Sequence, residues 1–349
     1  MKNKKKGRSS GGKTALVILC VVLGVVLAAL LGATVYAQRL LNKINYINPE
    51  DQVTMSPEEA SAYLATQETD PEGTEPTMND EDVDWGDENT GAEIGKEDHI
   101  INILLIGQDA RPGEKRTRSD VMILCTFNKD TKTLVMTSFL RDLYVRIPGY
   151  NNNKMNTAYA LGGMQLLDAT METNFGVHVD GNVEVNFEQF ADIIDTLGGV
   201  EIELRADEAN LINSVVTGSR LRSGSQRLNG EQALFYSRIR KLDSDADFSR
   251  TNRQRKVLDS LIQEFKNADM TTILSLLEQI MPMITTDMTP DQIVGYATEL
   301  FPLLASANIV SQRVPFDGAY AGRRIDGKSV LVADMKATRE FLQKTLLGE

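Results

Sequence analysis

The feature that most constrains this chain is a long apolar run close to its N-terminus. Residues 14–33 carry no charged side chain, although the segment before them is strongly basic. That basic segment contains Lys2, Lys4, Lys5, Lys6, Arg8 and Lys13. About 20 apolar residues are enough to cross a bilayer as a helix. A helix suits the bilayer because its backbone N–H and C=O groups form hydrogen bonds with one another. Positive charge on the N-terminal side predicts a cytoplasmic N-terminus and an extracellular C-terminal part.

A cleaved signal peptide is the alternative interpretation of this segment. Val35, Tyr36 and Ala37 resemble a small-residue cleavage site. The apolar run is longer than the central region of a signal peptide, which favours an anchor that is retained. We therefore expect a basic cytoplasmic tail at 1–13, a transmembrane helix at 14–37 and a single-pass protein of the cell membrane.

The composition changes abruptly after the apolar run. The segment 38–98 is, from about Asn48 onward, rich in Asp, Glu, Pro, Thr, Gly and Asn and poor in large apolar side chains. Such a segment cannot bury enough surface to fold alone, and its charges repel one another. We expect an acidic extracellular stalk, largely disordered, although a tail that binds a partner is the alternative. Within it, Ser56 followed by Pro57 predicts the start of a short helix.

Residues 99–349 alternate strand-like and helix-like patterns, which predicts an α/β domain with a mixed central β-sheet covered by helices. The strand-like segments are 100–107, 121–127, 133–140, 183–186 and 200–204. The helical patterns occupy 156–173, interrupted by Gly162 and Gly163, then 187–197, 230–236 and a later stripe of Val257, Leu258, Leu261, Ile262 and Phe265. Turn-forming residues at 128–132 favour a hairpin between the second and third strands.

Cysteine and histidine usage argues against several chemistries. Cys20 lies in the apolar run and Cys125 in a predicted strand, so the two cannot form a disulfide. Cys125 is expected to be a small buried hydrophobic residue. His99 and His178 have neither the spacing of metal ligands nor an evident triad companion. Zinc chemistry and histidine-based catalysis are therefore not expected.

Arginines concentrate late in a chain whose formal net charge is −12. Arg238, Arg240, Arg250, Arg253 and Gln254 lie close together in sequence. A guanidinium group presents a planar fork of donors that fits phosphate oxygens two at a time. The pattern indicates a polyanion site. Surface salt bridges with the three aspartates between Arg240 and Arg250 are the alternative.

A second polar segment follows the first predicted strand. It contains Asp109, Arg111, Arg118 and Asp120. Carboxylates are hard oxygen ligands suited to Mg²⁺, which takes one or two of them and completes its shell with water and phosphate oxygens. The segment is compatible with a metal and phosphate site. A polar loop whose acids and arginines neutralise one another is the alternative.

These residues belong to an ordered series of short motifs between about residues 98 and 345. The series runs through NILLIGQDAR at 102–111, RSDVM at 118–122, RD at 141–142, KMNTAYALGG at 154–163, VNF at 185–187, LGGV at 197–200, LNGEQA at 228–233 and the two arginine segments. It resembles the LytR-CpsA-Psr (LCP) family, whose members attach glycopolymers to the cell wall of Gram-positive bacteria. The resemblance implies an αβα fold with a long hydrophobic pocket, whose lining the sequence cannot distinguish from core.

The same resemblance implies the reaction. An undecaprenyl-diphosphate-linked glycopolymer, such as teichoic acid or capsule, is moved by an extracellular phosphotransferase onto a peptidoglycan hydroxyl, and undecaprenyl phosphate is released. A polyprenyl-diphosphate phosphohydrolase, with water as acceptor, and a non-catalytic cell-wall regulator are the alternatives. Nucleic acid is not an expected partner, because no helix-turn-helix or basic DNA-binding face is visible.

The resemblance also implies a role for each site residue. Arg118, Arg141, Arg238, Arg240 and Arg250 correspond to pyrophosphate-binding arginines, with Gln254 as a further polar contact. Asp109 and Asp120 correspond to acidic residues near Mg²⁺ and the reacting hydroxyl, so the expected catalytic set is Asp120, Asp109 and Arg118. Asp120 is the preferred general base. Arg111, Asp142 and Arg253 are second candidates.

Overall fold

The computed structural model describes residues 38–66, 74–86, 94–108, 117–243, 246–267, 269–304 and 306–348. The chain divides into two units, Met1–Ile44 and Asn45–Glu349. Of the first unit only 38–44 is described, and it begins with a helical turn. The predicted tail and transmembrane helix, 1–37, lie outside the described residues. In the part of the chain that is described, no helix is long and apolar enough to cross a membrane.

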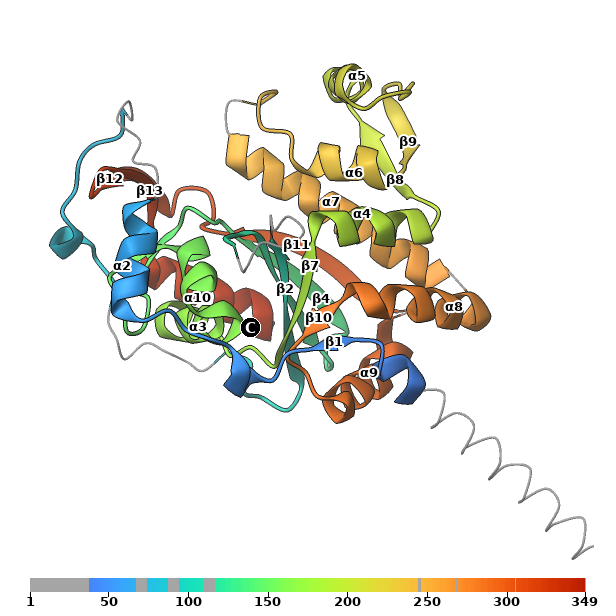
Figure 1. Cartoon of the computed structure of the whole chain (residues 1–349), viewed down its shortest axis with the longest axis horizontal. Coiled ribbons are helices and arrows are strands. Elements are labelled where there is room, and N and C mark those ends of the chain that lie inside the picture. The colour runs from blue at the N-terminus through green and yellow to red at the C-terminus, as the bar shows by residue number, and fades with distance from the viewer. Residues whose placement is uncertain are drawn as a thin grey trace, which may run out of the picture. The chain divides into compact units, whose positions relative to one another are not determined.

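A seven-stranded mixed sheet forms the centre of the second unit (Figure 1). In spatial order its strands are β1 (Asn45–Tyr46), β10 (Thr285–Thr286), β7 (Gly181–Asn186), β2 (Ile100–Gln108), β3 (Ser119–Asn128), β4 (Thr133–Phe139) and β11 (Asn308–Val314). Neighbours β2, β3 and β4 are antiparallel, so the predicted hairpin is confirmed. Strands β7 and β11 flank these three, and they run parallel to β2 and β4 respectively. The mixed sheet confirms the predicted fold class.

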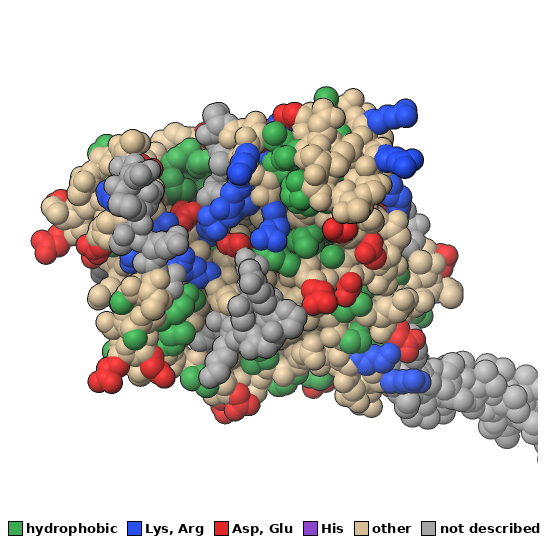
Figure 2. All heavy atoms as spheres, turned by 45° about the horizontal axis from the view of Figure 1, so that its top comes forward, with side chains coloured by type: hydrophobic (Ala, Val, Ile, Leu, Met, Phe, Trp, Pro, Cys, Tyr) green, Lys and Arg blue, Asp and Glu red, His purple; other side chains and the backbone are tan. Residues whose placement is uncertain are grey.

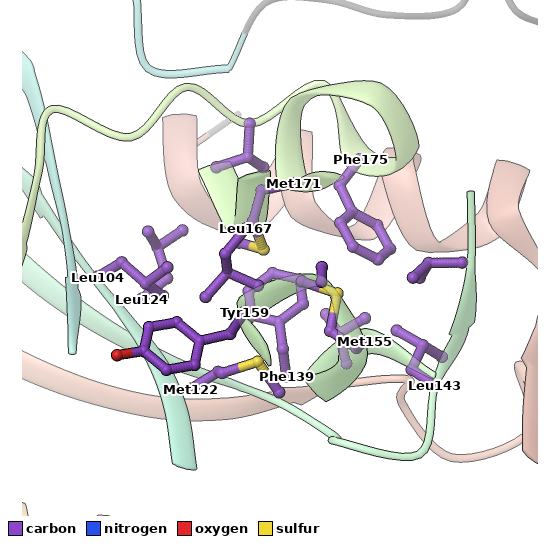
Figure 3. Packing of buried hydrophobic residues seen from close by; sticks show 14 of the residues in the cluster. Leu104, Met122, Leu124, Phe139, Leu143, Met155, Tyr159, Leu167, Met171 and Phe175 are labelled. Carbon is purple, nitrogen blue, oxygen red and sulfur yellow. The ribbon is translucent and has the colours of Figure 1, made fainter. Parts of the chain in front are cut away.

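Helices cover both faces of this sheet. On one face, α3 (Met155–Phe175) and α10 (Met335–Leu347) enclose the larger core, in which Phe139 and Phe175 pack with ring centroids 5.1 Å apart (Figure 3). On the other face, α7 (Ala246–Asn267) and α9 (Pro290–Leu304) pack on a second apolar layer. Side chains alternate along β4, so Met136 belongs to the α7 layer and Phe139 to the α3 layer.

Helix α3 carries the interruption that its glycines predict. Gly163 has φ 68° and ψ −153°, a conformation that only glycine adopts readily. A Cβ on Gly162 would lie 2.4 Å from that of Leu166. The helix therefore kinks, and both halves remain packed against the sheet.

A smaller α/β layer stands beside the sheet and has a core of its own. Its elements are α4 (Phe187–Thr196), β8 (Val200–Leu204), α5 (Ala206–Val215), β9 (Gly224–Leu228) and α6 (Gly230–Ser237), with α8 (Met270–Ile280) nearby (Figure 1). Strand β8 pairs with β9 and stays outside the seven-stranded sheet, unlike the expected mixed-sheet strand. Its residues alternate between buried and exposed, which suits a hairpin covered on one face.

The acidic stretch expected as a disordered stalk is in part folded onto the domain. Helix α2 (Pro57–Ala65) begins as predicted, with a capping box between Ser56 and Glu59. Ala60 on this helix is 2% exposed in the main core. Further along, Trp85 stacks on Tyr144 with ring centroids 6.0 Å apart. The few apolar residues of this stretch meet a core that the rest of the chain supplies, which average composition does not reveal.

The remaining elements are short. They are β5 (Tyr144–Val145), β6 (Asn153–Lys154), the hairpin of β12 (Tyr320–Ile325) and β13 (Lys328–Ala333), and 3-10 turns at Pro49–Asp51, Asp80–Asp82 and Met281–Met283. Strands β5 and β13 contact each other, which links this hairpin to the α3 side of the domain.

The packing of α2 predicts the effect of a charge on its buried face. Ala60→Asp should lower the free energy of unfolding by about 3 kcal/mol, because an unpaired carboxylate would enter the core. Ala62→Asp, on the exposed side of the same helix, should change it by less than about 0.5 kcal/mol. Urea unfolding followed by the fluorescence of Trp85, the single tryptophan, measures both. Equal values for the two variants would show that α2 does not pack on the domain.

Candidate functional site

A cavity of about 730 Å³ lies between one end of the sheet and the smaller layer. Its wall comes from strands β2, β3 and β7 and from helices α4, α6, α7 and α8. Six of the residues predicted for the site line this single cavity: Asp120, Arg141, Arg238, Arg240, Arg250 and Gln254. On the face shown in Figure 2, Lys and Arg side chains gather near the middle of the molecule, next to hydrophobic side chains.

These residues reach the cavity from distant parts of the chain. Asp120 is the second residue of β3, and Arg141 follows β4 by two residues. Arg238 is the C-cap of α6, where the carbonyl end of a helix favours a positive charge. Arg250 and Gln254 lie one turn apart on α7 and are 2% and 9% exposed. Only the tertiary fold places their charges at one surface.

One face of α7 changes from polar to apolar along the cavity. Arg250, Gln254, Leu258, Leu261 and Ile262 all line it. Their spacing of three and four residues puts them on the same side of the helix. From Arg250 to Ile262 the helix rises about 18 Å. The cavity therefore has a cationic end and an apolar end, a combination that suits an anionic head group attached to an apolar chain.

A chain of ion pairs orients the acid and the arginine of the sheet. Arg141 donates from Nη1 to Oδ1 of Asp120 at 2.8 Å and from Nε to Oδ2 of Asp142 at 3.2 Å. Lys154 donates to the other oxygen of Asp142 at 2.7 Å. Asp142, a second candidate for the site, is absent from the described lining of the cavity. It acts behind the site, by orienting Arg141.

Arg253 has a structural position and is likewise absent from the described lining. Its side chain is 3% exposed and donates to Glu208 at 2.8 Å and to the backbone oxygen of Ile239 at 3.1 Å. It also pairs with Asp243. Burial opposes its charge, but its hydrogen bonds with Asp243 and Glu208 outweigh burial and raise the pKa of Arg253. Because Ile239 lies between Arg238 and Arg240, Arg253 holds the backbone that carries both.

Three predicted residues stand apart from this group. Asp109 and Arg111 lie outside the described residues. Arg118 is described but is not part of the described cavity lining, although it is two residues from Asp120. Burial lowers the pKa of Lys328. The charge of Asp326 opposes this shift, and the positive charges of Arg118 and Lys154 add to it. Arg118 thus belongs to a basic group with Lys154 and Lys328.

The structure adds features that the sequence did not single out. The guanidinium of Arg238 lies 4.3 Å from the ring centroid of Phe187, the first residue of α4. A cation over an aromatic face is attracted to it, and the contact also orients the arginine. Phe187 lies in the VNF motif, and this motif was the only feature of the sequence that could have identified it as a site residue.

The apolar stripe predicted for α7 divides between two roles. Val257 is fully buried in the core of the smaller layer, as expected. Leu258, Leu261 and Ile262 line the cavity. The side chain of Phe265 lies outside the described residues. Helical periodicity shows which face of a helix is turned away from solvent. It does not show whether a residue on that face packs in a core or lines a cavity.

The donor set of the cavity restricts which metal could be held. Asp120 is the only carboxylate among the described lining residues. Where the chain is described, no group of three or more His, Cys, Asp or Glu side chains could hold a metal ion. One carboxylate beside an arginine cluster fits a hard cation such as Mg²⁺, whose remaining ligands are water and phosphate oxygens. It does not fit a closed structural site.

Known proteins share both the sequence and the fold. The LytR_cpsA_psr family model matches residues 60–346. Polyisoprenyl-teichoic acid–peptidoglycan teichoic acid transferase TagU of Bacillus anthracis is 32% identical over 237 residues, which are 67% of this chain and 75% of TagU. Regulatory protein MsrR of Staphylococcus aureus is 31% identical over 256 residues, which are 71% of this chain and 76% of MsrR.

Solved structures extend the likeness to the fold. The crystal structure of B. subtilis TagT aligns with a TM-score of 0.58 and 27% identity, covering 78% of this chain and 100% of that one. TagT bound to LIIa-WTA aligns with a TM-score of 0.59 and 29% identity, over 76% and 99% of the two chains. The family match runs from α2 to α10 and so includes every residue that lines the cavity. The chain belongs to the LytR_cpsA_psr family.

Proposed function

We propose that this protein is a membrane-anchored extracellular phosphotransferase of the cell wall. It moves an undecaprenyl-diphosphate-linked glycopolymer, a teichoic acid, capsule or similar polymer, onto a peptidoglycan hydroxyl and releases undecaprenyl phosphate. The observation that carries the proposal is the cavity with one arginine-rich end and one apolar end. A polyprenyl diphosphate has the same two parts. Transferase TagU and TagT bound to LIIa-WTA support a polymer substrate of the teichoic acid class.

The arginines address the main physical difficulty of the reaction. The acceptor oxygen forms a bond to the phosphorus that carries the polymer, and the bond from that phosphorus to the bridging oxygen breaks. Negative charge then grows on the departing lipid phosphate. Arg238, Arg240 and Arg250 already converge on the cavity, so they stabilise that charge without rearranging. An arginine supplied to a phosphoryl transfer contributes roughly 10³ to 10⁵ in rate.

Asp120 is the general base of the proposal. It lines the cavity beside the arginines, and Arg141 fixes its carboxylate through the 2.8 Å hydrogen bond. The proton of the acceptor hydroxyl passes to this carboxylate as the new bond to phosphorus forms. Asp120 and Asp109 would also hold Mg²⁺, which when bound supplies charge neutralisation to the phosphates. Asp109 lies outside the described residues.

A non-catalytic regulator is the second candidate, because the similar protein MsrR is named a regulatory protein. A regulator needs to bind its ligand but does not need a base aligned with the phosphate site. The pairing of Arg141 with Asp120 at the cavity wall favours turnover. A phosphohydrolase would use the same residues with water as acceptor.

Removing one cavity arginine should reduce turnover and leave the fold intact. Arg238 is exposed at the end of α6, so Arg238→Ala should reduce the rate on the order of 10²-fold or more with little change in stability. Arg222→Ala, at another exposed arginine, is the matched control and should keep the rate. Released polyprenyl phosphate and modified glycan are followed by mass spectrometry, with Mg²⁺, a synthetic polyprenyl-diphosphate sugar and peptidoglycan oligomers.

The products of the unmodified protein separate the candidate functions. Both products together, with both lost in Arg238→Ala, support the transferase. Polyprenyl phosphate without modified glycan would indicate the phosphohydrolase. Donor binding with neither product would support the regulator.

Filling the apolar end of the cavity should discriminate between lipid chain lengths. Leu277 of α8 lines the cavity, whereas Leu274 on the same helix is 36% exposed and is not one of the described lining residues. Leu277→Trp should raise KM about tenfold for an undecaprenyl donor, because the indole occupies space that the chain needs. A short prenyl donor should be unaffected, and Leu274→Trp should behave as the unmodified protein. Steady-state kinetics with both donors measure this. An equal effect on both donors would place the lipid elsewhere.

A further inference from the structure

Two further arginines, Arg255 of α7 and Arg313 of the strand β11, lie outside the described lining of the cavity. Arg255 extends from α7 and is 6% exposed. Arg313 extends from β11, with 22% of its side chain exposed. Within the described parts of the chain, Nε and Nη1 of Arg255 and Nε of Arg313 have no hydrogen-bond partner. Buried polar atoms in folded proteins nearly always have a partner, so these nitrogens need an explanation.

The register of the sheet places a hydroxyl beside Arg313. Arg313 of β11 lies opposite Ser138 of β4, which lies opposite Ile123 of β3. Met136 packs in the layer beneath α7, and alternation along the strand puts Ser138 on the same side. Ser138 is 1% exposed, and its Oγ has no partner among the described residues. Ile123 lines the cavity, so this row runs from the cavity wall to Arg313.

Arg255 lies over the same side of the sheet. It precedes Leu258 by three residues and Ile262 by seven, and both pack in the apolar layer beneath α7. Residues at this spacing share one face of a helix. Burial and the like charge of Arg313 lower the pKa of Arg255 to about 10. Arg255 therefore carries its charge at neutral pH, close enough to Arg313 for the two to repel each other.

Burying two neighbouring arginine charges destabilises the folded protein unless an anion or a carboxylate lies near them. An unpaired charge removed from water is strongly destabilising. No acidic side chain among the described residues contributes to the pKa shift of Arg255. Arg313 pairs through Nη2 with Asp317, which is 84% exposed, and its guanidinium lies 4.5 Å from the ring centroid of Phe248. These contacts orient Arg313 but do not use its Nε.

We propose that Arg255, Arg313 and Ser138 form a second oxyanion-binding site for one phosphate-sized group. Two guanidinium groups supply charge and forked donors, and the hydroxyl supplies a further donor. Its ligand is either a phosphate carried by the substrate or a free inorganic anion. The site is distinct from the set of Arg238, Arg240 and Arg250, because neither arginine lines the described cavity wall.

Phosphate-dependent stability tests the site without reference to catalysis. Inorganic phosphate is titrated at constant ionic strength into the full chain in non-ionic detergent, and the melting temperature is followed. A hundredfold excess over Kd should raise it by about 5 °C in the unmodified protein and in Arg238→Ala. Introduced into Arg238→Ala, where the cavity site is weakened, Arg255→Met should abolish this rise. Arg255→Met should melt no lower than the unmodified protein in phosphate-free buffer, because a buried unpaired charge is gone.

The proposal fails if the Arg238→Ala, Arg255→Met double variant keeps the phosphate response of Arg238→Ala, or if Arg238→Ala has none. Arg313→Gln, at a more exposed position, is the second variant in case Arg255→Met does not fold. In the Arg238→Ala background it should weaken phosphate binding at least tenfold in calorimetric titration. An unchanged affinity in a folded Arg313→Gln would also overturn the proposal.

A kinetic comparison identifies the source of the anion and rests on the proposed function. Two donors are used, one with a phosphate-bearing polymer and one with neutral sugars. If the site takes the substrate's phosphate, Arg255→Met raises KM about tenfold for the first donor only. If it takes a free anion, both KM values stay unchanged while the stability response is still lost. Absence of any turnover would count against the transferase and would leave the binding result standing.

Discussion

The cost of removing guanidinium groups from water is the constraint on which the site depends. An arginine at the edge of an apolar cavity tends to be neutralised by the nearest carboxylate, which would leave it unavailable to a ligand. Here Asp120 is the only carboxylate among the described lining residues, and the other carboxylates lie behind the cavity wall. Asp142 orients Arg141 from behind, and Glu208 with Asp243 holds Arg253, which in turn fixes the backbone around Ile239. One salt bridge expected as the alternative does exist, between Arg253 and Asp243, and it supports the backbone that carries Arg238 and Arg240.

The two cores of the domain make this placement possible. The main sheet, packed between α3 and α10 on one face and α7 and α9 on the other, positions Asp120 and Arg141 near the strand ends. The smaller layer brings α6, and with it Arg238 and Arg240. Helix α7 contributes to both layers, since Val257 packs in the smaller core and Leu258 against the sheet. A cavity remains where the two layers do not meet completely, and α7 supplies both its polar and its apolar wall.

The same helix also relates the cavity to the buried pair under it. Three consecutive residues of α7 face different surroundings. Arg253 pairs with Glu208 and Asp243, Gln254 lines the cavity, and Arg255 lies near Arg313. Successive residues of a helix point about 100° apart, so three neighbouring polar residues serve three environments. Charge is thereby concentrated on one element, while the net charge of the chain stays at −12. Arg253 is stabilised by acids, whereas Arg255 is the member for which the described residues provide none.

Local sequence was sufficient for the elements whose signals lie within a few residues. Alternation and turn chemistry predicted β2, β3 and β4, and glycine positions predicted the kink of α3, because side-chain direction and backbone conformation are local properties. Ordered motifs identified the family and the four arginines of the described cavity lining, Arg141, Arg238, Arg240 and Arg250. The sequence could not show that β8 leaves the main sheet, that Ala60 is buried, or that Arg253 supports the site from behind. It also could not distinguish Leu258, which lines the cavity, from Val257, which packs in the smaller core. Burial and enclosed volume depend on which distant segments meet, and only the tertiary structure decides that.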